Sequence, residues 1–139
     1  LDLAAMMMGT EFTGVMASGA RMHTTHIDEA TAQFTYASGG VARLRASRAA
    51  EVRERTMRVV YPSGEVDINF LTRQLVNTTP YKVRGAIAAD LLDPLGAADE
   101  GFYAACRGER RSPVPGHGAV AAVSRAEAAE ADALKKIDG

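Results

Sequence analysis

The sequence lacks several features that would place it in a specialised class of protein. A single cysteine, Cys106, rules out an internal disulfide in the 139 residues and fits a reducing compartment, so we expect a cytoplasmic protein. No apolar run approaches the roughly 20 residues that cross a bilayer, which argues against a membrane partner. The formal net charge of −1 leaves no basic surface for nucleic acid.

Motifs that carry catalysis or hold cofactors are also missing. The chain has no glycine-rich dinucleotide loop after a strand, no phosphate-binding loop, no serine-nucleophile elbow, no HExxH motif and no CxxC pair. We therefore assign no catalytic residue and no resident metal to it. Its length still allows a substantial core, and residues 1–139 are expected to form a single domain.

What the sequence does contain is a two-residue alternation of apolar and polar side chains across residues 29–75. The alternation falls into two pairs of segments, and a glycine-containing turn separates the members of each pair. This period predicts two consecutive antiparallel hairpins with one buried face. The predicted strands are residues 30–36, 42–47, 56–61 and 65–70.

Helices are predicted on both sides of the hairpins, which gives an α+β fold: an open, predominantly antiparallel β-sheet with helices packed on one face. In the second helix, Phe102, Ala105 and Cys106 are expected to face the core. In the first strand, Gly14 either weakens the strand prediction or marks a bulge. The remaining predicted elements are helices at residues 1–9, 93–107 and 119–136, a first strand at 11–17, a polar loop at 18–28 and a further strand or half strand within 75–82, while 83–92 is ambiguous.

The polar loop holds the one combination of residues that could bind a metal. His23 and His26 are three residues apart, and Asp28 and Glu29 follow directly. Imidazole and carboxylate groups at such spacing can hold zinc or iron. The spacing is short and unspecific, however, so a solvated loop is the default interpretation.

Three arginines stand in the connection between the two hairpins. Arg48, Arg53 and Arg55 alternate there with Glu51 and Glu54. One interpretation is a solvated connection in which these charges pair weakly with one another. The other is a rim of guanidinium groups at the end of a sheet, suited to a hydroxylated or anionic ligand.

Four stretches in order carry a resemblance to a known family. They are the helix ending Leu1–Gly9, the hairpin of residues 30–48, the hairpin of residues 58–70, and the stretch from Asp93-Pro94-Leu95 to the last helix. The first looks like the tail of an HxxDL…G helix, and the second closes on Ala46-Ser47-Arg48. Their order and spacing are similar to the C-terminal domain of the Gfo/Idh/MocA family, which includes glucose–fructose oxidoreductase and inositol dehydrogenase.

The resemblance implies one part of an NAD(P)-dependent oxidoreductase that acts on a CH–OH group of a sugar, cyclitol or related hydroxy compound. NAD or NADP would be bound by an N-terminal Rossmann domain, which is absent from this sequence. A lysine of that domain, and a histidine just before Leu1, would handle the hydroxyl proton. Since the sequence begins without Met and on an uncapped helix, we expect an excised piece that is inactive alone.

The resemblance also implies which residues meet the small-molecule substrate. Asp2 matches the last position of the helix motif. Arg48, Arg53 and Arg55 stand where the rim of the family's sheet approaches the substrate, and they would suit a carboxylate or a nucleotide phosphate.

A further implication is a homodimer or tetramer that forms through the open face of the sheet. A polar face of mixed charge can pair with its own copy across a two-fold axis. For this face, the alternative is that it is simply solvated. For the function, the alternative is a stand-alone α+β binding or scaffold module without catalysis. The residues expected on this face are Thr31, Gln33, Thr35, Arg43, Arg45, Arg58, Asp67 and Asn69.

Overall fold

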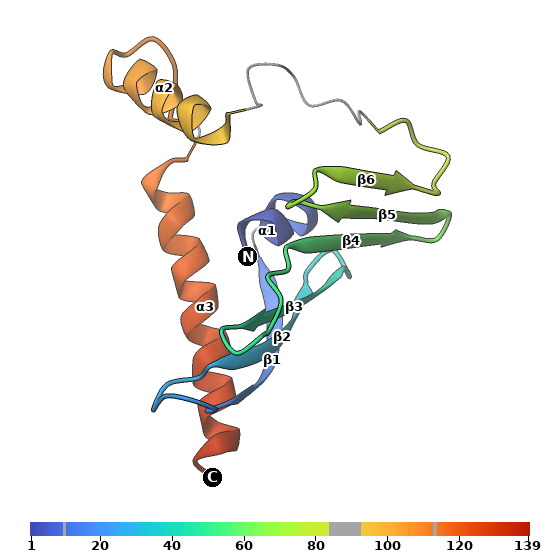
Figure 1. The fold of residues 1–139 in the computed structure, drawn as a ribbon, viewed down its shortest axis with the longest axis vertical. Helices are drawn as coiled ribbons and strands as arrows, with labels where there is room; N and C mark the ends of the chain where they lie inside the picture. Colours follow the sequence, from blue (N-terminus) through green and yellow to red (C-terminus); the bar gives the residue numbers. More distant parts are fainter. Residues whose placement is uncertain (10, 84–92, 113) are drawn as a thin grey trace. The chain divides into compact units, whose positions relative to one another are not determined.

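A computed structural model describes residues 1–9, 11–83, 93–112 and 114–139 (Figure 1). The chain divides into two compact units, which are described separately below. The first unit comprises Leu1–Ala50 with Val114–Gly139, and the second comprises Glu51–Pro113. The elements are α1 (Asp2–Met8), β1 (Phe12–Ala20), β2 (Glu29–Tyr36), β3 (Val41–Ser47), β4 (Thr56–Tyr61), β5 (Gly64–Asn69), β6 (Gln74–Asn77), α2 (Pro94–Cys106) and α3 (Gly116–Ile137).

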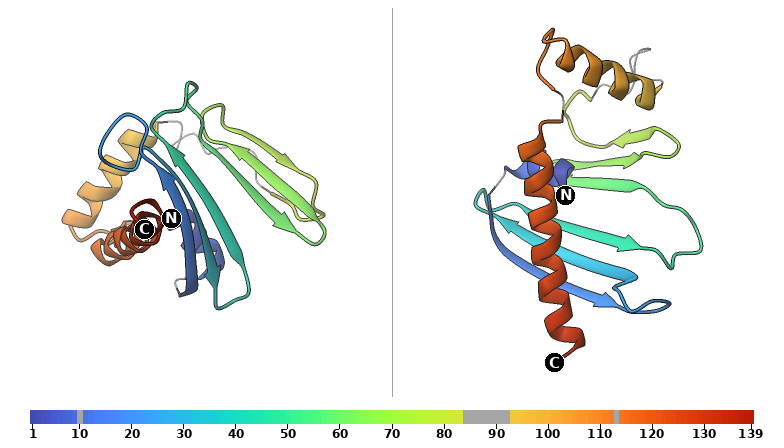
Figure 2. Two further views of the ribbon diagram at one scale, coloured as in Figure 1. Left: turned by 90° about the horizontal axis from the view of Figure 1, so that it is seen from below. Right: turned by 90° about the vertical axis from the view of Figure 1, so that its left-hand side faces the viewer.

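The first unit is an antiparallel sheet of three strands in the order β1-β2-β3, called the first sheet here. The register shifts between Phe12 and Gly14, so the bulge predicted at Gly14 is present. Helix α3 packs against β1, and Figure 2 shows it lying on one side of the first sheet. The other side of this sheet carries no helix in the part of the chain that the structure describes.

The core of the first unit lies between the first sheet and α3. Phe34 and Tyr36 are 0% and 1% exposed, and Ala17 and Ala133 are also buried. The ring of Phe12 meets that of Phe34 edge to face, with centroids 5.4 Å apart. These strand residues share one face because alternate residues of a strand point to opposite sides.

The second unit contains an antiparallel sheet in the order β4-β5-β6, called the second sheet here. Its central strand buries Val66. Gly64 begins that strand with a φ of 140°, a conformation that side chains disfavour. A Cβ atom at this position would also lie 2.8 Å from the carbonyl oxygen of Thr78, so both the backbone and the space require glycine.

Helix α2 begins as the sequence predicts. Asp93 is its N-cap, and the Asp93 carboxylate accepts a hydrogen bond of 3.1 Å from the Gly96 amide, while Pro94 occupies the first helical position.

The orientation predicted for this helix is wrong at two positions. Phe102 is 60% exposed and Cys106 is exposed, because Gly101 and Ala104 occupy the buried face instead.

The predicted α+β class with open antiparallel sheets is confirmed, although two sheets of three strands stand where one sheet was expected.

Strand β1 reaches Ala20, whereas a loop from Ser18 was expected, because the Asp28 amide continues the ladder by donating to the Ala20 carbonyl. Residues 84–92 of the ambiguous segment 83–92 lie outside the described residues. None of the helices in the described ranges combines the length and the apolar character of a membrane span.

Replacing Phe34 should test how much the first unit depends on its core. Phe34→Ala removes a fully buried ring and leaves a cavity, so the free energy of unfolding should fall by about 3–5 kcal/mol, as measured by urea denaturation of the native protein. Tyr36→Phe is the control, because the buried Tyr36 hydroxyl has no hydrogen-bond partner in the described structure and its removal should cost little. Equal losses for the two variants would contradict this core assignment.

Candidate functional site

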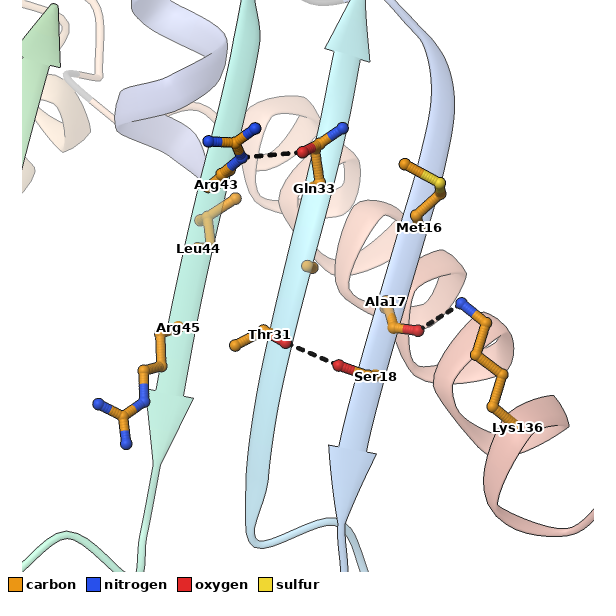
Figure 3. Close-up of a pocket in the computed structure, with 10 residues that line it drawn as sticks. Met16, Ala17, Ser18, Thr31, Gln33, Arg43, Leu44, Arg45 and Lys136 are labelled. Carbon is orange, nitrogen blue, oxygen red and sulfur yellow. Dashed lines mark hydrogen bonds between the residues drawn. The ribbon is translucent and has the colours of Figure 1, made fainter.

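The side of the first sheet opposite α3 is a polar surface with a shallow hollow of about 440 Å³ (Figure 3). We call this surface the open face. Its side chains come from all three strands, and Lys136 of α3 stands at its margin. The side chains around the hollow are Met16, Ser18, Thr31, Gln33, Arg43 and Arg45.

Strand register arranges these side chains in two rows. Met16, Gln33 and Arg43 lie opposite one another across the three strands. Ser18, Thr31 and Arg45 form the next row on the same face. Cross-strand neighbours of this kind are close enough to contact each other, so the rows form one continuous surface.

Hydrogen bonds hold several of these side chains in place. Arg43 Nε donates to Gln33 Oε1 at 2.9 Å, and the hydroxyls of Ser18 and Thr31 are 2.8 Å apart (Figure 3). Arg45 pairs with Glu29 at 3.1 Å. A guanidinium has five N–H donors, so Arg43 keeps donors beyond the one it uses on Gln33.

Exposed apolar side chains accompany the polar ones. Met16 is 60% exposed and Val41 is 45% exposed, and the register places Val41 on the open face opposite Thr35. Arginine and methionine are enriched where proteins contact one another. This mixture is therefore typical of a protein-contact surface and poor in the groups that perform chemistry.

The second sheet has a comparable polar face. Arg58 Nε donates a hydrogen bond of 2.7 Å to Asp67 Oδ1 and lies 3.8 Å from Glu65 Oε2, and the bond to Asp67 raises the pKa of Arg58. Asn69, which was also expected on this face, accepts hydrogen bonds from the amides of Leu71 and Thr72. Its side-chain oxygen therefore stabilises the turn that follows β5.

The four residues expected to contact substrate are divided between the two units. In the first unit, Asp2 lies in the first turn of α1, and Arg48 follows β3, with its guanidinium 3.2 Å from Asp28 Oδ1. In the second unit, Arg53 and Arg55 precede β4 and are exposed. The described structure joins Arg48 to the Asp28 loop by an ion pair, and it shows no ion pair between Arg48 and Asp2.

Asp28 organises the loop that held the predicted metal ligands. Its buried carboxylate accepts hydrogen bonds of 2.9, 2.9 and 3.0 Å from the amides of Met22, His23 and Thr24, and one of 3.0 Å from the Thr24 hydroxyl. These bonds, led by the amide of His23, hold the pKa of Asp28 well below its usual range. The carboxylate is thus occupied by the loop, and the described ranges contain no cluster of three or more potential metal ligands.

Sequence reasoning missed part of the open face. Ser18 was assigned to a loop, and Met16 and Lys136 were not considered for this surface. The signal for Met16 and Ser18 was available, because both continue the alternation of the first strand towards Ala20. Lys136 carried no such signal, because its place at the margin depends on how α3 packs.

No family model matches the chain, and no curated protein sequence matches it. Among solved structures, UDP-N-acetylglucosamine 3-dehydrogenase GnnA from Acidithiobacillus ferrooxidans matches in two crystal forms, with TM-scores of 0.77 and 0.75 and identities of 27% and 30%. These matches cover 94% and 95% of this chain. These neighbours are members of the Gfo/Idh/MocA family, which the sequence resembles.

A second member of the family has the same fold with little sequence in common. The WlbA dehydrogenase from Bordetella pertussis, solved in complex with NADH and UDP-GlcNAcA, matches with a TM-score of 0.77 and 11% identity over 97% of this chain. The chain spans 43–45% of the length of these neighbours. The predicted resemblance is thus confirmed, and the region of these neighbours that matches is their C-terminal domain.

Acid titration should show how much the loop depends on the Asp28 carboxylate. Because the pKa of Asp28 is lower in the folded protein than its unfolded value of about 4, the unfolded state takes up the proton first. The stabilisation is complete above pH 4 and is lost as the pH falls towards the folded pKa. Asp28→Asn should lower the melting temperature by several degrees at pH 7, and the loss of stability below pH 4 should become shallower.

Asp99→Asn is the matched control, because Asp99 is an exposed aspartate on α2. Differential scanning fluorimetry from pH 3 to pH 7 compares the variants. If Asp28→Asn kept both the melting temperature and the pH profile of the native protein, Asp28 would not be the organiser of this loop.

Proposed function

We propose that residues 1–139 form the C-terminal, substrate-binding and subunit-contact domain of a cytoplasmic NAD(P)-dependent oxidoreductase. The observation that carries this proposal is the 27–30% identity to a UDP-N-acetylglucosamine 3-dehydrogenase over nearly the whole chain. The substrate would be a sugar, cyclitol or related hydroxy compound. A nucleotide sugar is the first class to test, because both neighbouring enzymes have a UDP-sugar in their names or complexes.

The cofactor would be held outside this chain. WlbA is a dehydrogenase solved with NADH, and more than half the length of each neighbour has no counterpart in residues 1–139. We propose an N-terminal Rossmann domain as the missing part, with NAD or NADP bound to it. The nicotinamide would accept a hydride from the carbon that carries the hydroxyl group. The chain alone, without that domain, would be inactive.

The arginines would bind the substrate in this scheme. Arg48, Arg53 and Arg55 offer planar guanidinium groups, which suit a carboxylate or a diphosphate by paired hydrogen bonds. Asp2 would accept a hydrogen bond from a substrate hydroxyl. Arg48 is held by Asp28 and by the carbonyl oxygen of Ile27 at 3.1 Å, so its position is fixed by the loop that Asp28 organises.

The open face would carry the contact between subunits of a dimer or tetramer. Gln33, Thr35, Arg43 and Arg45 are available there, and the exposed Met16 adds apolar area. On the second sheet, the residues proposed for the contact between subunits are Arg58, Asp67 and Asn69. A mixed-charge face of this kind can meet a second copy of itself, because Arg43 and Arg45 of one copy can then face Glu29 of the other.

Enzyme assay of the full-length native protein tests the proposed reaction. With NAD or NADP and UDP-N-acetylglucosamine, the expected result is formation of the reduced nicotinamide. Arg53→Ala should raise the KM for substrate roughly tenfold or more, because a hydrogen bond to a charged group is lost. Arg110→Ala is the control, since it removes another exposed arginine outside the predicted rim. Absence of hydride transfer with every UDP-sugar tried would leave the stand-alone binding module as the better account.

Charge reversal on the open face tests the subunit contact. Arg43→Glu should place like charges and unpaired donors in the contact, and it should raise the dissociation constant of the oligomer at least tenfold by light scattering after size exclusion. Lys135→Glu makes the same change of charge on the exposed side of α3 and should have no such effect. Identical masses for Arg43→Glu and the native protein across concentrations would exclude this part of the open face as the contact.

A further inference from the structure

The C-terminal turns of α3 bind the backbone of β1 through two side chains. The Ala17 amide donates to Asp132 Oδ2 at 2.7 Å. Lys136 Nζ donates to the Ala17 carbonyl oxygen at 2.7 Å (Figure 3). Lys136 and Asp132 also bind each other at 2.8 Å, one helical turn apart. Both backbone groups of a single strand residue are therefore bound by one ion pair, which we call the Asp132–Lys136 clasp.

Ala17 belongs to the edge of the first sheet. In an antiparallel ladder, residues alternate between pairs that bond to the neighbouring strand and pairs whose N–H and C=O point away from it. Because both groups of Ala17 reach α3, Ala17 is one of the residues whose backbone points out of the sheet. The strand order β1-β2-β3 puts β1 at that edge, where unpaired groups can accept another strand.

The sequence of β1 gives this edge little protection of its own. Residues Phe12–Ala20 contain no charged residue and no proline, which are the usual safeguards of an edge strand. The bulge between Phe12 and Gly14 disturbs one end of the strand. The middle of the strand, around Ala17, depends on groups supplied from elsewhere in the chain.

Other contacts hold the end of α3 at this edge. Arg21, directly after β1, donates two hydrogen bonds of 2.8 and 3.2 Å to the carboxylate of Asp138, directly after α3. Ala133, between the two members of the clasp, is buried. The clasp is thus anchored on a helix end that packing and an ion pair already fix in place.

We propose that the Asp132–Lys136 clasp closes the β1 edge against strand addition by a second copy of this chain. The clasp occupies the donor and the acceptor of Ala17 as a neighbouring strand would. The occupant it excludes is β1 of another copy, because two uncharged edges of this sequence can pair antiparallel without meeting a charge. Association would then be confined to surfaces other than this edge.

Removing the clasp from the full-length native protein tests this proposal. Asp132→Ala combined with Lys136→Ala should speed hydrogen exchange of the Ala17 amide at least tenfold and should produce larger species that grow with concentration. Glu130→Ala combined with Lys135→Ala is the matched control, because it removes one acid and one lysine from exposed positions of the same helix. The control should leave both readouts unchanged.

Two further variants keep the outcome decisive. If the double variant does not fold, Lys136→Met alone frees the Ala17 carbonyl while it keeps the Asp132 bond and the apolar stem, and it should show a smaller increase in association. Adding Arg43→Glu to the clasp variant distinguishes association through the β1 edge from association through the open face. Association through the β1 edge should persist when the open face is disrupted. A folded clasp variant with faster exchange at Ala17 and the native mass at all concentrations would overturn the proposal. None of these readouts depends on hydride transfer, so they stand apart from the proposed reaction.

Discussion

Burial of one face of the first sheet beneath α3 is the constraint on which the first unit depends. Phe34 and Tyr36 are almost completely removed from solvent there, and Ala133 of α3 is also buried. Because successive strand residues point to opposite sides, the same burial forces Gln33 and Arg43 onto the other side. The open face is therefore a consequence of the core, and a shift of one residue in register would destroy both together.

Local patterns made much of this fold predictable. The strands of both hairpins follow the two-residue alternation, and Asp93 with Pro94 gives the start of α2 through a cap whose bond is visible in the structure. The bulge at Gly14 is likewise a local property of a strand glycine. Each of these features depends on residues that are neighbours in the sequence, which is why the sequence alone reveals them.

Features that depend on distant residues were not predictable in this way. Nothing near Ala17 in the sequence indicates that Asp132 and Lys136 bind its backbone, since more than a hundred residues separate them. Phe102 was expected inside because aromatic residues usually are, yet α2 buries its glycine and alanine side. Asp28 was predicted as a possible metal ligand, but its carboxylate accepts hydrogen bonds from three amides of its own loop.

The same distinction applies to the candidate site. The polar residues of the open face could be named from the alternation, and the structure gathers those of β2 and β3 with Met16 and Ser18 around one hollow. The proposed arginine rim is not a feature of a single unit, because Arg48 lies in one unit while Arg53 and Arg55 lie in the other. The role proposed for these arginines as substrate contacts rests on the resemblance to the family, while the structure itself gives an ion pair between Arg48 and Asp28.

The central claim is that this chain is one domain of a nicotinamide-dependent oxidoreductase. The measurement that tests it most directly is calorimetric titration of NADH into the native protein that contains residues 1–139, purified at its natural length. The account predicts saturable binding of one NADH per subunit by a product much larger than 14.7 kDa. A native product that binds neither NADH nor NADPH would contradict it and would indicate a binding or scaffold module instead.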